Sequence, residues 1–141
     1  MRETATINKQ LMQAIFNALA TGNGKPFLNA MADDFCWVIP GHTAWSRRFE
    51  GKKAVQDELF RPLFAQFATQ YTNRATRFVA DDDIVVVECQ GQVTTIKGRP
   101  YNNNYCYVCR LQDGKLKEIV EYMDTQMMDA TLDPPQPTSA G

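Results

Sequence analysis

The sequence lacks an excess of charge of one sign, and it lacks any long apolar run. Its 141 residues include 15 Lys and Arg against 16 Asp and Glu, which gives a formal net charge of -1 with the two signs interspersed. Nucleic-acid binding depends on a basic surface, so we expect no nucleic-acid partner. No apolar run approaches the roughly 20 residues needed to cross a bilayer, and the first residues contain no apolar signal segment. We therefore expect no membrane partner, and a soluble protein of the cytoplasm.

Histidine is scarce, and the cysteines are poorly placed for a metal centre. The chain has one histidine, His42, and four cysteines. Two of these, Cys106 and Cys109, lie in a single strand-like run, where an offset of three positions puts their side chains on opposite faces. This spacing does not allow both thiols to hold one metal ion. We expect reduced, buried thiols, no metal ligands and no residues that bind a cofactor.

Hydrophobic periodicity predicts helices first and strands later. Apolar residues recur at helical spacing over residues 7–19, and Gly22 is placed to end that helix in a left-handed conformation. A short helix should run from Pro26 to Ala32, and a longer one should begin near Gly51 and either break or restart at Pro62. Strand patterns cover residues 35–39, 69–80 and three runs between residues 84 and 124.

The ends of these elements carry turn and capping signals. Asp33 and Asp34 should turn the chain before the first strand, and residues 42–46 should form an irregular loop. Asp124 should cap a last short helix. This order indicates an α+β fold, in which helices cover one face of a curved antiparallel sheet. We expect one domain over residues 1–132 and a disordered, Pro-rich tail over residues 133–141.

The three consecutive strands between residues 84 and 124 carry most of the functional signal. With a period of two, they place five polar side chains on one face of the sheet: Glu88, Gln90, Asn103, Tyr105 and Glu121. A buried polar group without a partner costs several kcal/mol. Five such groups aimed at a core therefore predict a cavity.

Two of these groups are carboxylates that would share a dehydrated cavity. Because Glu88 and Glu121 would repel each other there, one should hold its proton nearer to neutrality, which gives an acid and a base in one site. Tyr105 and Asn103 would donate hydrogen bonds to a developing enolate. The alternative is that the carboxylates form structural ion pairs with Arg74, Arg77 or Arg110, or point outward at a bulge. Tyr105 would then serve packing, and Asn103 a strand end.

Further residues are candidates for substrate binding. His42 lies in the loop after the first strand together with Trp45, which we expect at the mouth of the cavity, although a solvated histidine and a core tryptophan are the alternatives. The complete predicted substrate-binding set is Gln90, His42, Trp45, Met123 and Ile119.

Several segments together resemble one family of small α+β proteins. They are Asp33-Asp34-Phe35-Cys36-Trp37-Val38-Ile39-Pro40-Gly41, Phe49-Glu50-Gly51-Lys52-Lys53-Ala54-Val55, Gly98-Arg99-Pro100-Tyr101-Asn102-Asn103, and Asp113-Gly114-Lys115-Leu116 with Glu121-Tyr122-Met123-Asp124-Thr125. Over residues 7–132 the chain is similar to the SnoaL-like group of the NTF2-like superfamily. The resemblance implies a cone-shaped curved antiparallel sheet, wrapped around N-terminal helices and enclosing a pocket, and a homodimer that forms through the outer face.

The resemblance is less informative about activity, because one fold hosts many activities. In ketosteroid isomerase an Asp before a Pro at the end of the first strand removes the proton, and Ile39 stands at that place here. In limonene-1,2-epoxide hydrolase an Arg and an Asp on one strand work with an Asp on the last strand. Those places fall on Glu88, Gln90 and Glu121, so only the last carboxylate is kept.

We therefore expect a cofactor-free acid/base enzyme of the isomerase, cyclase or dehydratase type. Its substrate would be a small hydrophobic, oxygenated molecule, and Glu121 would be the principal acid or base, assisted by Glu88, Tyr105 and Asn103. The alternative is a protein of the same fold that binds a small ligand without turnover or acts as a dimeric accessory protein. The scaffold alternative would use Val86, Val108 and Val120 on the outer sheet face.

Overall fold

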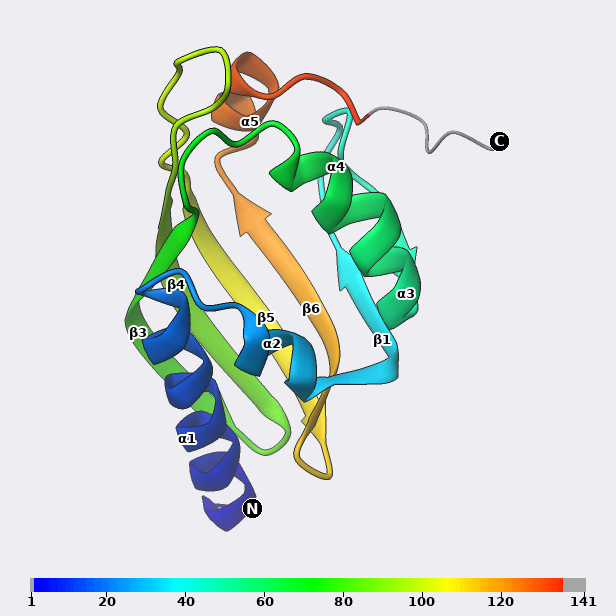
Figure 1. Ribbon diagram of the computed structural model, residues 1–141. Helices are drawn as coiled ribbons and strands as arrows, with labels where there is room; N and C mark the ends of the chain where they lie inside the picture. Colours follow the sequence, from blue (N-terminus) through cyan, green and yellow to red (C-terminus); the bar gives the residue numbers. More distant parts are fainter. Residues whose placement is uncertain (1, 136–141) are drawn as a thin grey trace.

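A six-stranded sheet forms the body of the protein in a computed structural model that describes residues 2–135 (Figure 1). The strand order is β2-β1-β6-β5-β4-β3. The strands are β1 (Met31–Val38), β2 (Arg48–Glu50), β3 (Thr72–Asp81), β4 (Ile84–Gln92), β5 (Asn104–Gln112) and β6 (Lys115–Met123). Neighbouring strands run antiparallel except β1 and β6, which are parallel. The predicted α+β fold with a curved sheet is confirmed, with this one parallel pair added.

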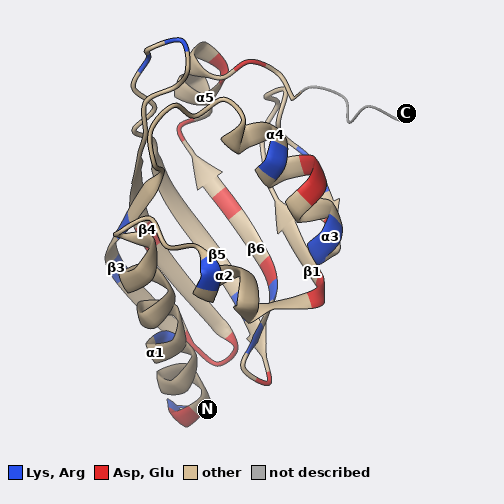
Figure 2. Cartoon of the chain, viewed as in Figure 1, with Lys and Arg blue, Asp and Glu red and all other residues tan. Residues whose placement is uncertain are grey.

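The helices cover one face of the sheet (Figure 1). Charged residues of both signs are interspersed over the helices, strands and loops (Figure 2). The helical segments are α1 (Arg2–Leu19), α2 (Lys25–Ala30), α3 (Lys52–Ala54), the π-helical turn η1 (Val55–Phe60), α4 (Arg61–Phe64) and α5 (Thr125–Thr131). Helix α1 packs on β3 and β4. None of the helices in the described part of the chain is both long and apolar enough to span a membrane.

Helix α1 forms where the sequence predicts it, but its buried face is shifted, since Ile7 at the start of the predicted apolar spacing is 55% exposed. Its buried side chains lie at helical spacing, and they are Asn8, Met12, Ile15, Phe16 and Leu19. Gly22 follows the helix with a φ of 86°, a left-handed conformation in which a side chain would be strained. The glycine thereby turns the chain back toward the short helix α2, as the sequence predicts.

One part of the predicted pattern is wrong in detail. The first strand begins at Met31, so Asp33 and Asp34 belong to a strand and not to a turn. A register shift between Met31 and Cys36 lets both aspartates face solvent. The helical segment after Gly51 restarts as α4 at Arg61, as the sequence allows, with Pro62 in the first turn, where a missing N–H is tolerated.

The C-terminal segment is anchored at both ends of α5. Asp124 accepts a hydrogen bond from the Met127 backbone N–H at 3.1 Å, which is the predicted N-cap. Asp133, which the sequence places in the tail, is held by the domain: its carbonyl oxygen accepts from Trp45 Nε1 at 3.0 Å, and its carboxylate pairs with Lys97 at 2.8 Å. Residues 136–141 of the predicted tail lie outside the described residues.

The Asp124 cap gives a first prediction. Asp124→Ala removes the side-chain acceptor of the Met127 N–H at the start of α5, so the free energy of unfolding should fall by about 1 kcal/mol. Chemical denaturation measures the change. Gln126→Ala, at an exposed position in the same helix, is the matched control and should leave stability within about 0.5 kcal/mol of the parent.

Candidate functional site

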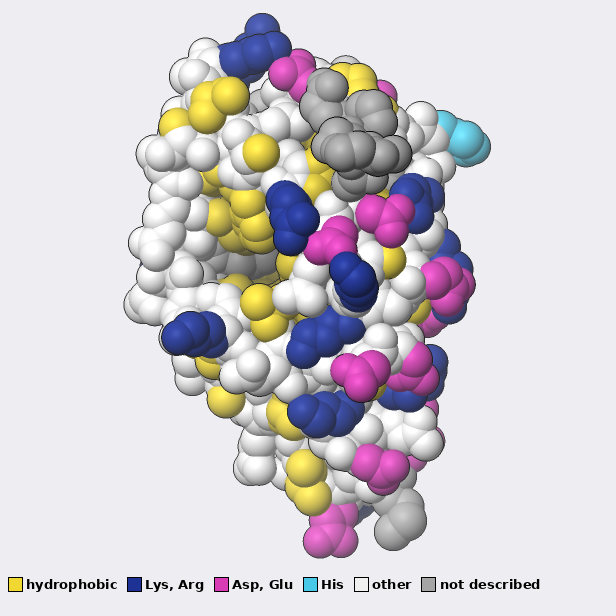
Figure 3. Space-filling view, turned by 45° about the vertical axis from the view of Figure 1, so that its right-hand side comes forward, with side chains coloured by type: hydrophobic (Ala, Val, Ile, Leu, Met, Phe, Trp, Pro, Cys, Tyr) yellow, Lys and Arg dark blue, Asp and Glu magenta, His cyan; other side chains and the backbone are white. Residues whose placement is uncertain are grey.

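A cavity of about 120 Å³ lies between the inner face of the sheet and the helices α2, η1 and α4. Figure 3 shows a hollow in the surface with hydrophobic side chains around it. Apolar side chains form most of the wall, among them Phe27, Trp37, Ile39, Leu59, Phe60, Leu63, Phe64, Phe67 and Met128. The polar groups that line it are Tyr71, Asn73, Tyr101, Tyr105, Tyr107 and Glu121. The cavity is therefore apolar with a few hydroxyl groups and a single carboxyl.

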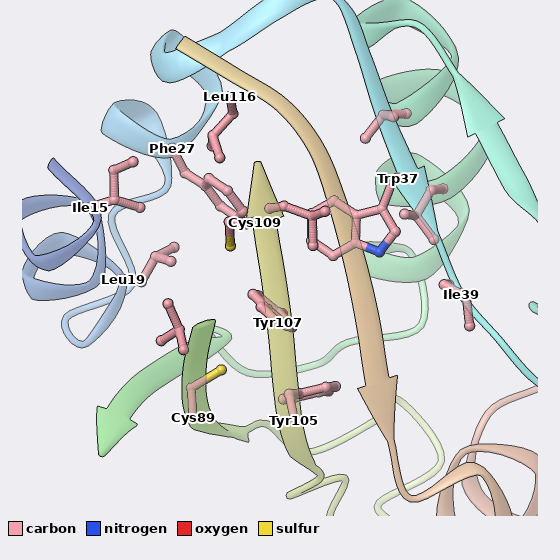
Figure 4. Close-up of a cluster of buried hydrophobic side chains, with 14 of the residues drawn as sticks. Ile15, Leu19, Phe27, Trp37, Ile39, Cys89, Tyr105, Tyr107, Cys109 and Leu116 are labelled. Carbon is pink, nitrogen blue, oxygen red and sulfur yellow. The ribbon is translucent and has the colours of Figure 1, made fainter. Parts of the chain in front are cut away.

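Glu121 projects into this cavity from near the C-terminal end of β6. Its side chain is 8% exposed, and Oε1 accepts a hydrogen bond from Trp37 Nε1 at 3.0 Å. The parallel pairing of β1 with β6 brings Trp37 beside this strand, and Tyr107 is the register partner of Glu121 on β5. In Figure 4, Tyr105, Tyr107 and Cys109 extend from one face of β5 on the side where Trp37 lies. Neutral donors thus surround the carboxyl.

The apolar surroundings change the acidity of Glu121. Burial raises the pKa of its carboxyl from the usual 4.5 to about 7, and hydrogen bonds from Trp37 and Tyr107 offset part of that rise. None of the described residues that line the cavity is Lys, Arg or His, so no cation stabilises the carboxylate there. Near neutral pH both the acid and the carboxylate are populated, and either can exchange a proton with a ligand.

Four tyrosine hydroxyls share the cavity with this carboxyl. Burial raises the pKa of Tyr101 to about 12, and it also raises the pKa of Tyr71, Tyr105 and Tyr107 well above the usual value, so all four hydroxyls remain protonated. Asn73 Nδ2 donates to the hydroxyl oxygens of Tyr71 and Tyr107, at 3.2 and 3.4 Å. Because the amide occupies acceptor sites on these hydroxyls, their own protons can point elsewhere.

Gly91 has no side chain, and this leaves space for the rings of Tyr71 and Tyr105. A Cβ atom at Gly91 on β4 would lie 2.7 Å from the Tyr71 hydroxyl and 3.0 Å from a ring carbon of Tyr105. Any larger residue would push both rings toward the cavity. Gly91 therefore helps to define the shape of this end of the site, which sequence reasoning did not identify.

The predicted place of Glu88 is wrong. This carboxylate lies on the opposite face of the sheet, where it pairs with Arg77 Nε at 2.6 Å. The bond from Arg77 lowers the pKa of Glu88, the reverse of the shift at Glu121. In β4 the buried residues are Val85, Val87, Cys89 and Gly91, so the alternate positions, Glu88 included, face outward. The two glutamates do not share a cavity, and the structural ion pair with Arg77 is the arrangement found.

Gln90 and Asn103 also lie outside the cavity wall. Gln90 lies two positions after Glu88 on β4, so its side chain is on the same outer face of the sheet, and it is exposed. Asn103 is fully buried, but its amide is saturated: Nδ2 donates to the Tyr101 hydroxyl and to the Asp124 carbonyl, and Oδ1 accepts from the backbone N–H of Asn104 and Asp124. Asn103 holds Tyr101 and the start of α5 in place and has no group left for a substrate.

The predicted substrate-binding residues do not line the cavity either. His42 is exposed, and Trp45 is 1% exposed with its indole N–H bonded to the Asp133 carbonyl. Ile119 is buried and Met123 packs against the core. Of the predicted site, the structure brings together Glu121 and Tyr105 only. The role of Trp37 as a donor, and the places of Tyr71, Asn73 and Tyr107 in the cavity wall, were not predicted from the sequence.

The raised pKa of Glu121 predicts a pH dependence of stability. The pKa of this carboxyl is 4.5 in the unfolded chain and about 7 in the folded protein. Between these values the folded protein keeps a proton that the unfolded chain releases. The free energy of unfolding should therefore fall as pH rises through this range, by about 3 kcal/mol at about 1.4 kcal/mol per pKa unit, and level off above it. Urea unfolding at pH 5 and pH 8 measures the fall.

Two variants isolate this effect. In Glu121→Gln the fall of the free energy of unfolding with pH should be lost, because no carboxyl remains at this position to titrate. Glu88→Gln should keep it, because Glu88, whose folded pKa is lowered, is ionised in both states over most of this range. The same slope in the parent protein and in Glu121→Gln would contradict the assignment.

Comparison with known proteins places this geometry in a family. The family model for the SnoaL-like domain matches residues 12–119. No curated protein matches the chain in sequence. Among solved structures, an NTF2-like protein of unknown function from Burkholderia pseudomallei is 21% identical, with a TM-score of 0.73 over 86% of this chain and 93% of that one.

Two further solved structures share the fold. A candidate SnoaL-like polyketide cyclase from Jannaschia sp. CCS1 is 14% identical, with a TM-score of 0.74 over 96% of each chain. TerC, co-crystallised with polyporic acid, is 19% identical, with a TM-score of 0.72 over 86% of this chain and 94% of that one. Because the family model covers most of the chain, the protein belongs to the SnoaL-like domain family of the NTF2-like fold.

Proposed function

We propose that this protein is an acid/base enzyme that moves a proton next to a carbonyl group in a small hydrophobic, oxygenated molecule. The observation that carries the proposal is a single buried carboxyl, Glu121, in an apolar cavity, with a pKa raised by burial to about 7. Perturbed carboxyls in clefts are typical of acid/base sites. The similarity to a candidate polyketide cyclase, and to a protein crystallised with polyporic acid, supports a ligand of this class.

The proposed reaction uses Glu121 as a proton carrier. The carboxylate takes a proton from the carbon beside the carbonyl, and the electron pair of that C–H bond moves toward the carbonyl oxygen. The enolate formed in this way accepts a hydrogen bond from a tyrosine hydroxyl. Glu121, now protonated, returns the proton to another carbon for an isomerisation; for a cyclisation, the enolate carbon attacks a second carbonyl, and Glu121 gives its proton to the alkoxide that this attack forms. Neither route, as proposed, needs a cofactor or a metal ion.

The tyrosines have the right chemistry for the stabilising role. Tyr105 lines the cavity on the strand beside Glu121, and its raised pKa keeps it protonated, so it can donate to a developing oxyanion without losing a proton to water. The single hydroxyl proton of Tyr107 goes to the Glu121 carboxyl, and Asn73 donates to the hydroxyl oxygens of Tyr71 and Tyr107. We assign Tyr105 as the oxyanion donor, and Tyr107 and Asn73 as positioning residues.

We also propose that the outer face of the sheet pairs with a second copy of the chain. Five valines form a row across five strands in register: Val79, Val86, Val108, Val120 and Val38. An apolar row of this kind on an open face suits an isologous contact.

The four free thiols agree with a reducing compartment, so we place the protein in the cytoplasm.

The proton transfer is testable with a simple ketone. With 3-cyclohexenone in D2O, the parent protein should accelerate both deuterium uptake beside the carbonyl and conversion to the conjugated enone, as followed by NMR. The rate should rise with pH through a midpoint near 7, because the carboxylate form of Glu121 is the base. Glu121→Gln should slow the reaction by about 10²- to 10⁴-fold.

Glu88→Gln is the matched control for this assay, because it removes a carboxylate from the other face of the sheet and should keep the parent rate. Equal rates in the parent protein and Glu121→Gln would contradict the enzymatic proposal. Saturable binding of the ketone without any exchange would instead support the alternative of a ligand carrier.

The dimer is testable by light scattering after size exclusion. The parent protein should elute with the mass of two chains. Val108→Lys places a charge at the centre of the valine row on both copies, so it should elute with the mass of one chain. Ile7→Lys, at an exposed position on α1, should remain dimeric. A monomeric parent protein, or a dimeric Val108→Lys, would contradict the proposed interface.

A further inference from the structure

The cavity around Glu121 is small. Its volume of about 120 Å³ is below that of a buried cavity of about 150 Å³ that admits benzene. Sites that enclose a whole drug-sized ligand have volumes of roughly 300–1,000 Å³. Because the cavity is also open at its mouth (Figure 3), it has room for about one six-membered ring, and any larger molecule must extend through the mouth.

The mouth itself has an apolar rim, which we define as Leu28, Phe60, Leu63, Phe64 and Phe67. Each rim residue lines the cavity and is also partly open to solvent. Phe64 is 44% exposed, and it is the one large exposed hydrophobic side chain of the described residues that borders the cavity. Exposed apolar surface costs about 25 cal/mol per Å² relative to burial, so a rim of this kind favours an apolar cover.

The rim is ordered by contacts within it. The Phe64 ring lies 5.7 Å from Phe60 and 5.5 Å from Phe67, measured between ring centroids, and 6.0 Å from Tyr71, which lines the cavity. Phe60 in turn lies 5.5 Å from Trp37, the residue that donates to Glu121. A continuous aromatic path thus runs from the exposed mouth to the carboxyl.

Charge further limits what binds here. No Lys, Arg or His stands among the described residues of the cavity wall, and Glu121 becomes negative as it releases its proton. A carboxylate or phosphate on the ligand would lose its hydration without gaining a cation. The tyrosine hydroxyls, in contrast, offer donors to a neutral oxygen.

We propose that the substrate is a neutral molecule in two parts. One oxygen-bearing ring enters the cavity next to Glu121, and an apolar extension lies across the rim on Phe64 and its neighbours. The inference rests on the proposed function for the placement of the oxygen, and it adds the size of the reacting ring, the need for an apolar extension and the exclusion of anions.

A series of 4-alkylcyclohexanones tests this proposal by calorimetry, from cyclohexanone to 4-pentylcyclohexanone. For the parent protein the Kd should fall by about twofold to fourfold for each added methylene, since a methylene that leaves water entirely contributes about fourfold. Cyclohexanecarboxylate should bind at least tenfold more weakly than cyclohexanone at pH 8.

Rim variants locate the extension. Phe64→Ala should remove most of the gain with chain length, so its loss of affinity relative to the parent should be several-fold larger for 4-pentylcyclohexanone than for cyclohexanone. Leu28→Ala, which changes the rim from the α2 side, should give the same length-dependent loss. Ile7→Ala is the matched control, because Ile7 is 55% exposed but does not border the cavity, and it should change neither Kd.

Two results would overturn the inference: a Kd that does not depend on chain length, or equal losses for the short and the long ketone in Phe64→Ala. Tighter binding of cyclohexanecarboxylate would overturn the exclusion of anions. These are binding measurements, so they fail separately from the proton-transfer assay. Length-dependent binding without exchange would leave the two-part ligand standing and remove the enzymatic proposal, and exchange without length dependence would do the opposite.

Discussion

The hydrogen bond from the Trp37 indole to the Glu121 carboxyl joins the two parallel strands of the sheet at the wall of the cavity. A buried carboxyl without any partner would cost several kcal/mol, whereas an arginine partner would hold it permanently ionised. The indole N–H avoids both outcomes, because it is a neutral donor in an aromatic wall. Trp37 also packs on Phe60 and Tyr107, so the donor cannot turn away without disturbing the cavity. The chemistry that we propose depends on this arrangement.

Much of the fold could be predicted because its signals are local. The period of α1, the left-handed stop at Gly22 and the Asp124 cap each depend on a few neighbouring residues. The features that were missed depend on distant parts of the chain. Strand β2 has three residues, too few for a pattern, and it exists because its backbone pairs with β1. The π-helical turn and the early start of β1 likewise come from tertiary packing, which overrides local preference.

The candidate site was predicted only in part, because the period of two gives the two faces of a strand but not which face is inside. Reading polar residues as pocket lining succeeded for Glu121 and Tyr105. It failed for Glu88, whose partner on β5 is Cys106, one position from Tyr105 and therefore on the other face. The apolar residues Val85, Val87 and Cys89, at alternate positions of β4, indicated the face of the strand that is inside. Tyr71 and Asn73 come from the region of the edge strand β3, and no spacing along the chain indicates that they meet Tyr107.

The central claim is that Glu121 is a carboxyl whose affinity for a proton is set by an apolar cavity. The most direct test is an NMR titration of the side-chain carboxyl carbon of Glu121 in protein labelled with ¹³C at glutamate, assigned by comparison with Glu121→Gln. Our account predicts a midpoint near pH 7, well separated from the other glutamates. A midpoint near 4.5, the value of an ordinary glutamate, would contradict it and leave the fold without the proposed acid and base.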